Sequence, residues 1–115
     1  MNVNWDRIES FASLDDPEEV EWLKDMIVSL IDNMKDRLAE LEGVKKNPDA
    51  TKSQSVLHQI KGVAANFGLE NLQKLAAEAE LKAKEGDIQS AITIADGIAP
   101  SWEDAKKELT DRFPV

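Results

Sequence analysis

The protein has 115 residues, of which 42% are hydrophobic and 32% are charged, and its formal net charge is −9. This length suits a single core, so residues 1–115 are expected to form one domain, as a monomer. The acidic balance and the scattered basic residues argue against binding to nucleic acid or to an anionic membrane surface. The chain has no cysteine and one histidine, which argues against a disulfide framework and a structural metal site.

The N-terminus has neither the basic start nor the apolar run of a secretory signal. No segment approaches the roughly 18 consecutive apolar residues of a membrane span. A cytoplasmic protein is therefore expected.

The first predicted element is a short helix over residues 5–12, capped by Asn4 or Asp6, which covers one end of the core. A longer helix starts at Asp16 and Pro17, where an aspartate cap precedes a first-turn proline. Its apolar residues repeat every three or four positions, which predicts about 27 helical residues ending near Gly43.

The next helix is capped by Asp49 or Thr51 and is expected to end at Phe67. Gly68 is placed to adopt the left-handed conformation that closes a helix, so a tight antiparallel hairpin follows it. The second helix of this hairpin ends at Gly86.

The last segment keeps helical phase over about 26 residues from Ile88 to Phe113. Pro100 removes a backbone hydrogen bond and Gly97 weakens the same turn, so a kink or a brief break is expected there. The whole pattern predicts an all-α fold, an antiparallel up-down-up-down four-helix bundle with a short N-terminal cap helix.

The only histidine, His58, lies in the helix that precedes Gly68. The apolar residues of that helix gather within an arc of roughly 120°, and His58 lies roughly 160° from the centre of that arc. Its imidazole is therefore expected to face solvent. Lys61 and Gly62 lie one turn further along, where a glycine costs roughly 1 kcal/mol relative to alanine. Room beside His58 is the expected compensation.

These residues carry a resemblance to a known family. The spacing His-x-x-Lys-Gly-x-Ala-x-x-x-Gly-x-x-x-Leu resembles the histidine-containing phosphotransfer (HPt) domain and is formed here by His58, Lys61, Gly62, Ala64, Gly68 and Leu72. The specific motif spans only these residues, whereas the predicted helical bundle extends the resemblance over nearly the whole chain.

The resemblance implies that His58 accepts a phosphoryl group from a receiver-domain aspartyl phosphate, or from a histidine kinase, and passes it to another receiver. An imidazole is mostly neutral near pH 7, so one ring nitrogen can act as the nucleophile. Lys61 would stabilise the phosphoryl group and Gly62 would give the partner clearance. Gln54 and Ala65 are candidate contacts for the receiver.

The sequence has no glycine loop to cradle ATP, no cluster of Mg²⁺ ligands and no general base beside His58. The protein is therefore expected to be a phosphocarrier rather than an enzyme, with no cofactor of its own and with Mg²⁺ on the partner receiver. The acidic residues Glu70, Glu78 and Glu80 are interpreted as solvated surface.

Two other interpretations stay open. One is an adaptor with the same four-helix fold that binds a signalling partner without being phosphorylated. The other is the phosphoacceptor domain of a larger hybrid kinase, although Met1 and the nearly complete bundle favour a free-standing protein.

Overall fold

The computed structural model describes residues 3–115, and over these residues the chain is helical with no strand. Six helices follow one another along the chain: α1 (Trp5–Glu9), α2 (Pro17–Lys46), α3 (Ala50–Asn66), α4 (Glu70–Lys84), α5 (Ile88–Ala95) and α6 (Ile98–Arg112). The all-α prediction is confirmed.

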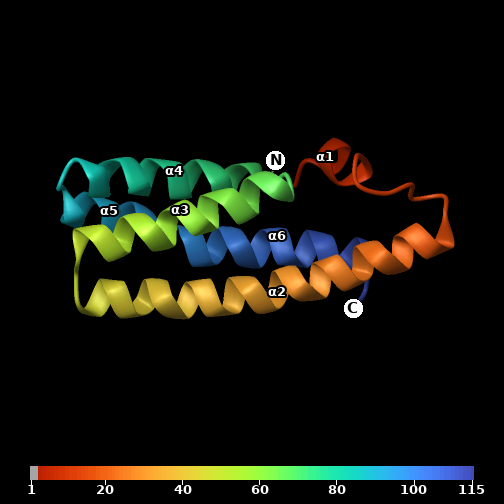
Figure 1. Ribbon diagram of the computed structural model, residues 1–115, viewed down its shortest axis with the longest axis horizontal. Coiled ribbons are helices and arrows are strands. Elements are labelled where there is room, and N and C mark those ends of the chain that lie inside the picture. Colours follow the sequence, from red (N-terminus) through yellow and green to blue (C-terminus); the bar gives the residue numbers. More distant parts are fainter. Residues whose placement is uncertain (1–2) are drawn as a thin grey trace.

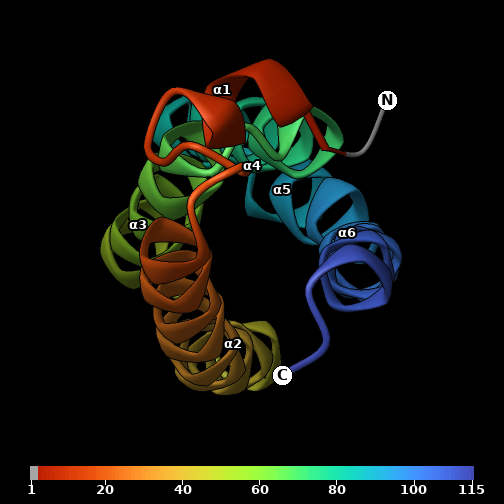
Figure 2. The same ribbon diagram turned by 90° about the vertical axis from the view of Figure 1, so that its right-hand side faces the viewer.

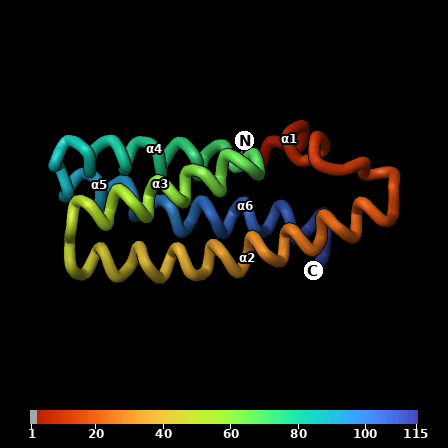
Figure 3. Tube along the Cα trace, in the orientation of Figure 1, coloured from red at the N-terminus to blue at the C-terminus, as the bar shows by residue number. Residues whose placement is uncertain are grey.

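The helices lie side by side in a bundle that measures 47 × 21 × 19 Å along its principal axes. Helices α2, α3 and α4 alternate in direction, and α5 and α6 together make the fourth pass along the long axis (Figures 1 and 3). An end-on view shows these passes surrounding a common interior, with α1 over one end (Figure 2). The most extensive contact between two helices is that of α3 with α4.

The helix starts follow the predicted capping chemistry. The side chain of Asp16 accepts the backbone N–H of Glu18, and the side chain of Asp49 accepts the backbone N–H of Lys52. Asn4, rather than Asp6, caps α1. Each cap satisfies a backbone donor that the first helical turn leaves unpaired.

Helix α2 is longer than the sequence predicted, because it passes through Gly43 and ends at Lys46. The residues after the glycine hold the extra turn in place. Val44 is buried, and the Lys45 ammonium lies 2.7 Å from the Asp96 carboxylate. These tertiary contacts offset the roughly 1 kcal/mol that glycine costs inside a helix.

The last predicted helix is two helices, and the break falls at Asp96 and Gly97. Pro100 is the third residue of α6, where its missing N–H leaves no helical hydrogen bond unmade. The brief break expected around Gly97 and Pro100 is confirmed, and the apolar phase carries across it because Ala95, Ile98 and Trp102 are all buried.

The core runs along the inside of the bundle and draws on every long helix. Its largest fully buried side chains on the four passes are Leu23, Ile27, Met34, Leu57, Ile60, Leu72, Ile98 and Leu109. Over the described residues, none of the helices is long and apolar enough to cross a membrane.

Helix α1 is attached to the turn between α3 and α4. The backbone N–H of Asn4 donates to the Gly68 carbonyl at 2.7 Å, and the Arg7 guanidinium Nε donates to the Asn66 carbonyl at 3.1 Å. Gly68 has a φ of 67°, in the left-handed region, so its predicted role in closing α3 is confirmed. Ile8 of α1 is fully buried, as expected for a cap helix.

Candidate functional site

His58 lies near the middle of α3, on its outer face. The inward positions of the helix are taken by Val56, Leu57, Ile60 and Ala64, all buried. His58 points the other way, and its side chain is 71% exposed. The predicted solvent-facing position is confirmed, because the 3.6-residue period alone separates the two faces.

The imidazole of His58 has a partner that the sequence analysis missed. Its Nδ1 lies 3.0 Å from Oε2 of Glu80, which is on the neighbouring helix α4. The Glu80 side chain is only 4% exposed. The interpretation of Glu80 as a solvated surface residue is therefore wrong, whereas Glu70 and Glu78 are exposed as expected.

One feature of the sequence could have found this pair. Gly68 is the turn of the α3–α4 hairpin, with His58 ten positions before it and Glu80 twelve positions after it. Residues at similar distances from the turn of an antiparallel hairpin come opposite each other. The helical period of α4 also places Glu80 beside the buried Ala76, Ala79 and Ala83.

The second oxygen of Glu80 is held by two lysines. Nζ of Lys61 lies 2.9 Å from Oε1, and Nζ of Lys84 lies 3.3 Å from the same atom. Burial raises the pKa of the Glu80 carboxyl, but the hydrogen bonds from the two ammonium groups outweigh burial and hold this pKa below its ordinary value. Glu80 is thus a carboxylate at neutral pH.

This ionisation state decides which nitrogen of His58 carries the proton. A carboxylate can only accept, so Nδ1 of the neutral ring must donate to Glu80. The lone pair of the neutral ring is then on Nε2, on a side chain that is largely exposed. The arrangement therefore leaves an unprotonated ring nitrogen, which can act as a nucleophile, on an exposed side chain.

The other predicted site residues lie around His58 on α3. Gly62 is exposed, and a Cβ added there would meet nothing within 4 Å, so the open space expected at this glycine is present. Gln54 and Ala65 are half-buried. Lys61 is 31% exposed, so it lies at the edge of the solvent-facing stripe rather than within it.

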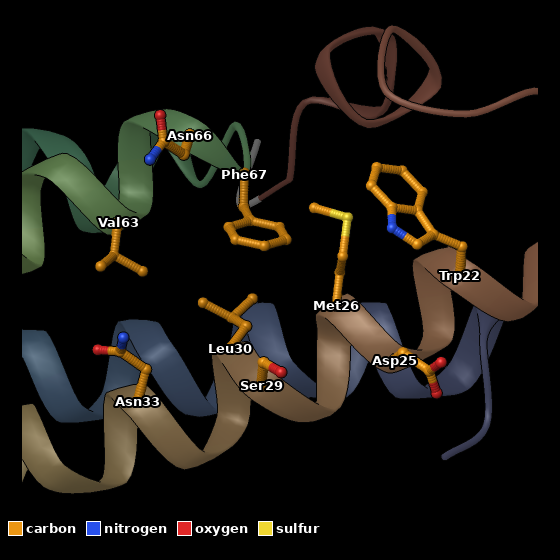
Figure 4. Close-up of a pocket in the computed structure, with 9 residues that line it drawn as sticks. All are labelled: Trp22, Asp25, Met26, Ser29, Leu30, Asn33, Val63, Asn66 and Phe67. Atoms are coloured by element: carbon orange, nitrogen blue, oxygen red, sulfur yellow. The ribbon is translucent and has the colours of Figure 1, made fainter. Parts of the chain in front are cut away.

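A groove of about 500 Å³ runs between α2 and the end of α3. Phe67 points into it from α3, opposite Met26 and Leu30 of α2, and Trp22 lines its outer end (Figure 4). Trp22 remains 49% exposed. The polar side chains of the groove are those of Asp25, Ser29, Asn33 and Asn66. The groove has no histidine and no lysine, so it lacks the groups that the His58 site brings together.

Among residues 3–115, no three His, Cys, Asp or Glu side chains are grouped in a way that could hold a metal ion. The chemistry that the described residues bring together is the cluster of His58, Glu80, Lys61 and Lys84.

Fold and site together define a helical bundle that presents a single oriented histidine on its surface. The family model described as the Hpt domain matches residues 25–111, from the third turn of α2 nearly to the end of α6. The chain therefore belongs to the Hpt domain family. No curated protein and no solved structure gives a match.

Membership of this family gives the protein a role related to phosphotransfer in two-component signalling. Hpt domains are phosphocarrier modules rather than catalysts. They generally interact with receiver domains and histidine kinases.

Proposed function

We propose that the protein is a phosphorelay intermediate in which His58 accepts a phosphoryl group from a receiver-domain aspartyl phosphate, or from a histidine kinase, and passes it to the aspartate of another receiver. The observation that carries this proposal is the hydrogen bond between Nδ1 of the exposed His58 and the buried Glu80 carboxylate. In this proposal the bundle has up-down-up-down order, with α5 and α6 as its fourth member, and the protein acts as a monomer.

The proposed transfer makes one bond to phosphorus and breaks another. The Nε2 lone pair attacks phosphorus, the bond from phosphorus to the aspartyl oxygen breaks, and the aspartate leaves as a carboxylate. Nδ1 keeps its proton throughout, so the phosphorylated ring is cationic and lies against the negative charge of Glu80. In the onward step the ring leaves as neutral imidazole, which is a much better leaving group than imidazolate.

Lys61 is proposed to stabilise the phosphoryl group. An ammonium group has three donors, and Lys61 uses one on Glu80 Oε1, so its charge and its other donors are available to phosphoryl oxygens. Gly62 is proposed to give the partner clearance, since its Cβ position faces open space. Gln54 and Ala65 remain proposed partner contacts.

The proposal assigns ATP chemistry and metal binding to the partners. Mg²⁺ is expected on the receiver domain, and this chain is proposed to need no cofactor of its own. The alternative is a four-helix adaptor that binds a signalling partner without being phosphorylated. The two functions differ in one observable, the covalent phosphate on His58.

The test is incubation of the protein with a panel of phosphorylated receiver domains. The wild-type protein is expected to acquire an acid-labile, alkali-stable phosphate, and a His58→Gln variant of equal thermal stability is expected to acquire none. Labelling of the His58→Gln variant would refute the assignment of this residue. Stable binding of a phosphorylated receiver without any transfer would favour the adaptor.

A further inference from the structure

Glu80 is the one charged residue that is buried among those the structure describes. A buried carboxylate is stable as an anion only where cations or hydrogen-bond donors compensate for the lost solvent. The state of Glu80 in turn decides which nitrogen of His58 carries the proton. The groups that keep Glu80 charged therefore also determine which nitrogen of His58 has the lone pair.

Two cations compensate this single charge, and they come from different helices. Lys61 extends from α3, the helix of His58, whereas Lys84 lies one turn after Glu80 on α4. Both ammonium groups contact Oε1, which leaves Oε2 to His58. Lys84 lies outside the motif that identified the site, and its side chain is 56% exposed.

We propose that Lys84 is a second positioning residue for phosphotransfer, and that either Lys84 or Lys61 suffices to keep Glu80 charged and the proton of His58 on Nδ1. This inference rests on the proposed function and deepens it. Lys84 acts only through Glu80, whereas Lys61 is also proposed to meet the phosphoryl group. Removal of one lysine or the other should therefore change the transfer rate by different amounts, but neither removal should change which ring nitrogen of His58 is protonated.

The physical reason for this redundancy is the cost of the uncompensated state. With one lysine removed, Glu80 still has an ammonium group on Oε1. With both removed, the buried carboxyl takes up a proton, because a lone buried charge is too unfavourable. Its hydroxyl then donates to Nδ1, and the ring proton moves to Nε2. The ring then has no lone pair on Nε2, because its lone pair is on Nδ1 and accepts the hydrogen bond from Glu80.

The experiment compares Lys61→Gln, Lys84→Gln and the double variant in the full-length protein. Long-range ¹H–¹⁵N NMR of unphosphorylated protein reports which nitrogen of His58 is protonated, and transfer from a phosphorylated receiver is measured in parallel. Lys82→Gln is the matched control, because it removes the same charge from α4 where the lysine pairs with Glu85 at 3.7 Å.

Both single variants are expected to keep the proton on Nδ1, and the double variant is expected to move it to Nε2. Transfer by Lys84→Gln should stay within about fivefold of wild type, because Lys61 still contacts Oε1 and the Lys84 ammonium group is itself largely exposed. The double variant should transfer at least about tenfold more slowly than Lys61→Gln, which corresponds to about 1.4 kcal/mol. Lys82→Gln should match wild type in both measurements.

Two results would overturn the inference: a proton that stays on Nδ1 in the double variant, or one that moves to Nε2 in either single variant. The second result decides the matter even if the double variant melts early, because each single variant keeps one ammonium group on Oε1. A wild type that never acquires phosphate would refute the proposed function instead. The NMR result does not depend on transfer, so the two failures are distinguishable.

Discussion

Substitutions of Gly62 should have separate effects on the stability of the protein and on the rate of phosphotransfer. This glycine lies inside α3, one turn after His58, and a Cβ there would meet nothing within 4 Å. Replacing a helical glycine by alanine removes backbone freedom from the unfolded chain and stabilises a regular helix by roughly 1 kcal/mol. For a domain of this size that corresponds to an increase in melting temperature of about 3 to 6 °C.

Gly43 is the matched control, because it also lies inside a helix with nothing within 4 Å of its Cβ position. Gly43→Ala and Gly62→Ala should both raise the melting temperature. The larger change Gly62→Gln should fold as well, since its side chain would extend into open space, but it would stand where a receiver must approach His58. Gly43→Gln makes the same change on a different helix.

The assays are thermal melts and phosphotransfer rates on the four variants. Transfer should collapse in Gly62→Gln and persist in Gly43→Gln, while all four proteins remain folded. A Gly62→Gln protein that folds and transfers at the wild-type rate would refute clearance as the role of this glycine. Unfolding of Gly62→Gln would mean that the position faces a neighbouring helix.

Two further predictions concern the elements around the site. Gly68→Ala should destabilise the fold by about 2 to 4 kcal/mol in chemical denaturation, because a φ of 67° disfavours a side chain. The new Cβ would also lie 2.9 Å from two atoms of the N-terminal segment, the Asn4 carbonyl oxygen and Cβ of Arg7. Unchanged stability would show that α1 moves away at no cost. The lowered pKa of Glu80 gives a stabilising contribution that is present above its ordinary value of 4.5 and is lost as the pH falls through the lowered pKa. Glu80→Gln should therefore reduce the loss of unfolding free energy on acidification, and an unaltered pH profile would contradict this assignment.

The features that the sequence predicted correctly are those that depend on nearby residues. The caps at Asp16 and Asp49 and the left-handed Gly68 are local, because each depends on backbone groups only a few residues away. The outward position of His58 likewise needs only the helical period and the apolar residues around it. The family motif could be recognised from the sequence because its residues lie close together, in α3, in the turn after it and in the first turn of α4.

Other features depended on contacts between distant parts of the chain. The extra turn of α2 past Gly43 is held by Val44 in the core and by the Lys45–Asp96 ion pair, which joins residues 51 positions apart. Local propensity alone favours an end at the glycine. Tertiary packing reverses that preference.

The sequence by itself determined that one helix presents a lone histidine, with Lys61 and Gly62 beside it, on the surface of an all-α protein. Only the tertiary structure decided that this histidine is oriented by Glu80, because a helical period shows which way a side chain points and not what it meets on the next helix. Glu80 belongs to a charged stretch that looks solvated when α4 is considered alone. Packing of α3 against α4 buries its carboxylate and brings two lysines onto one of its oxygens and His58 onto the other.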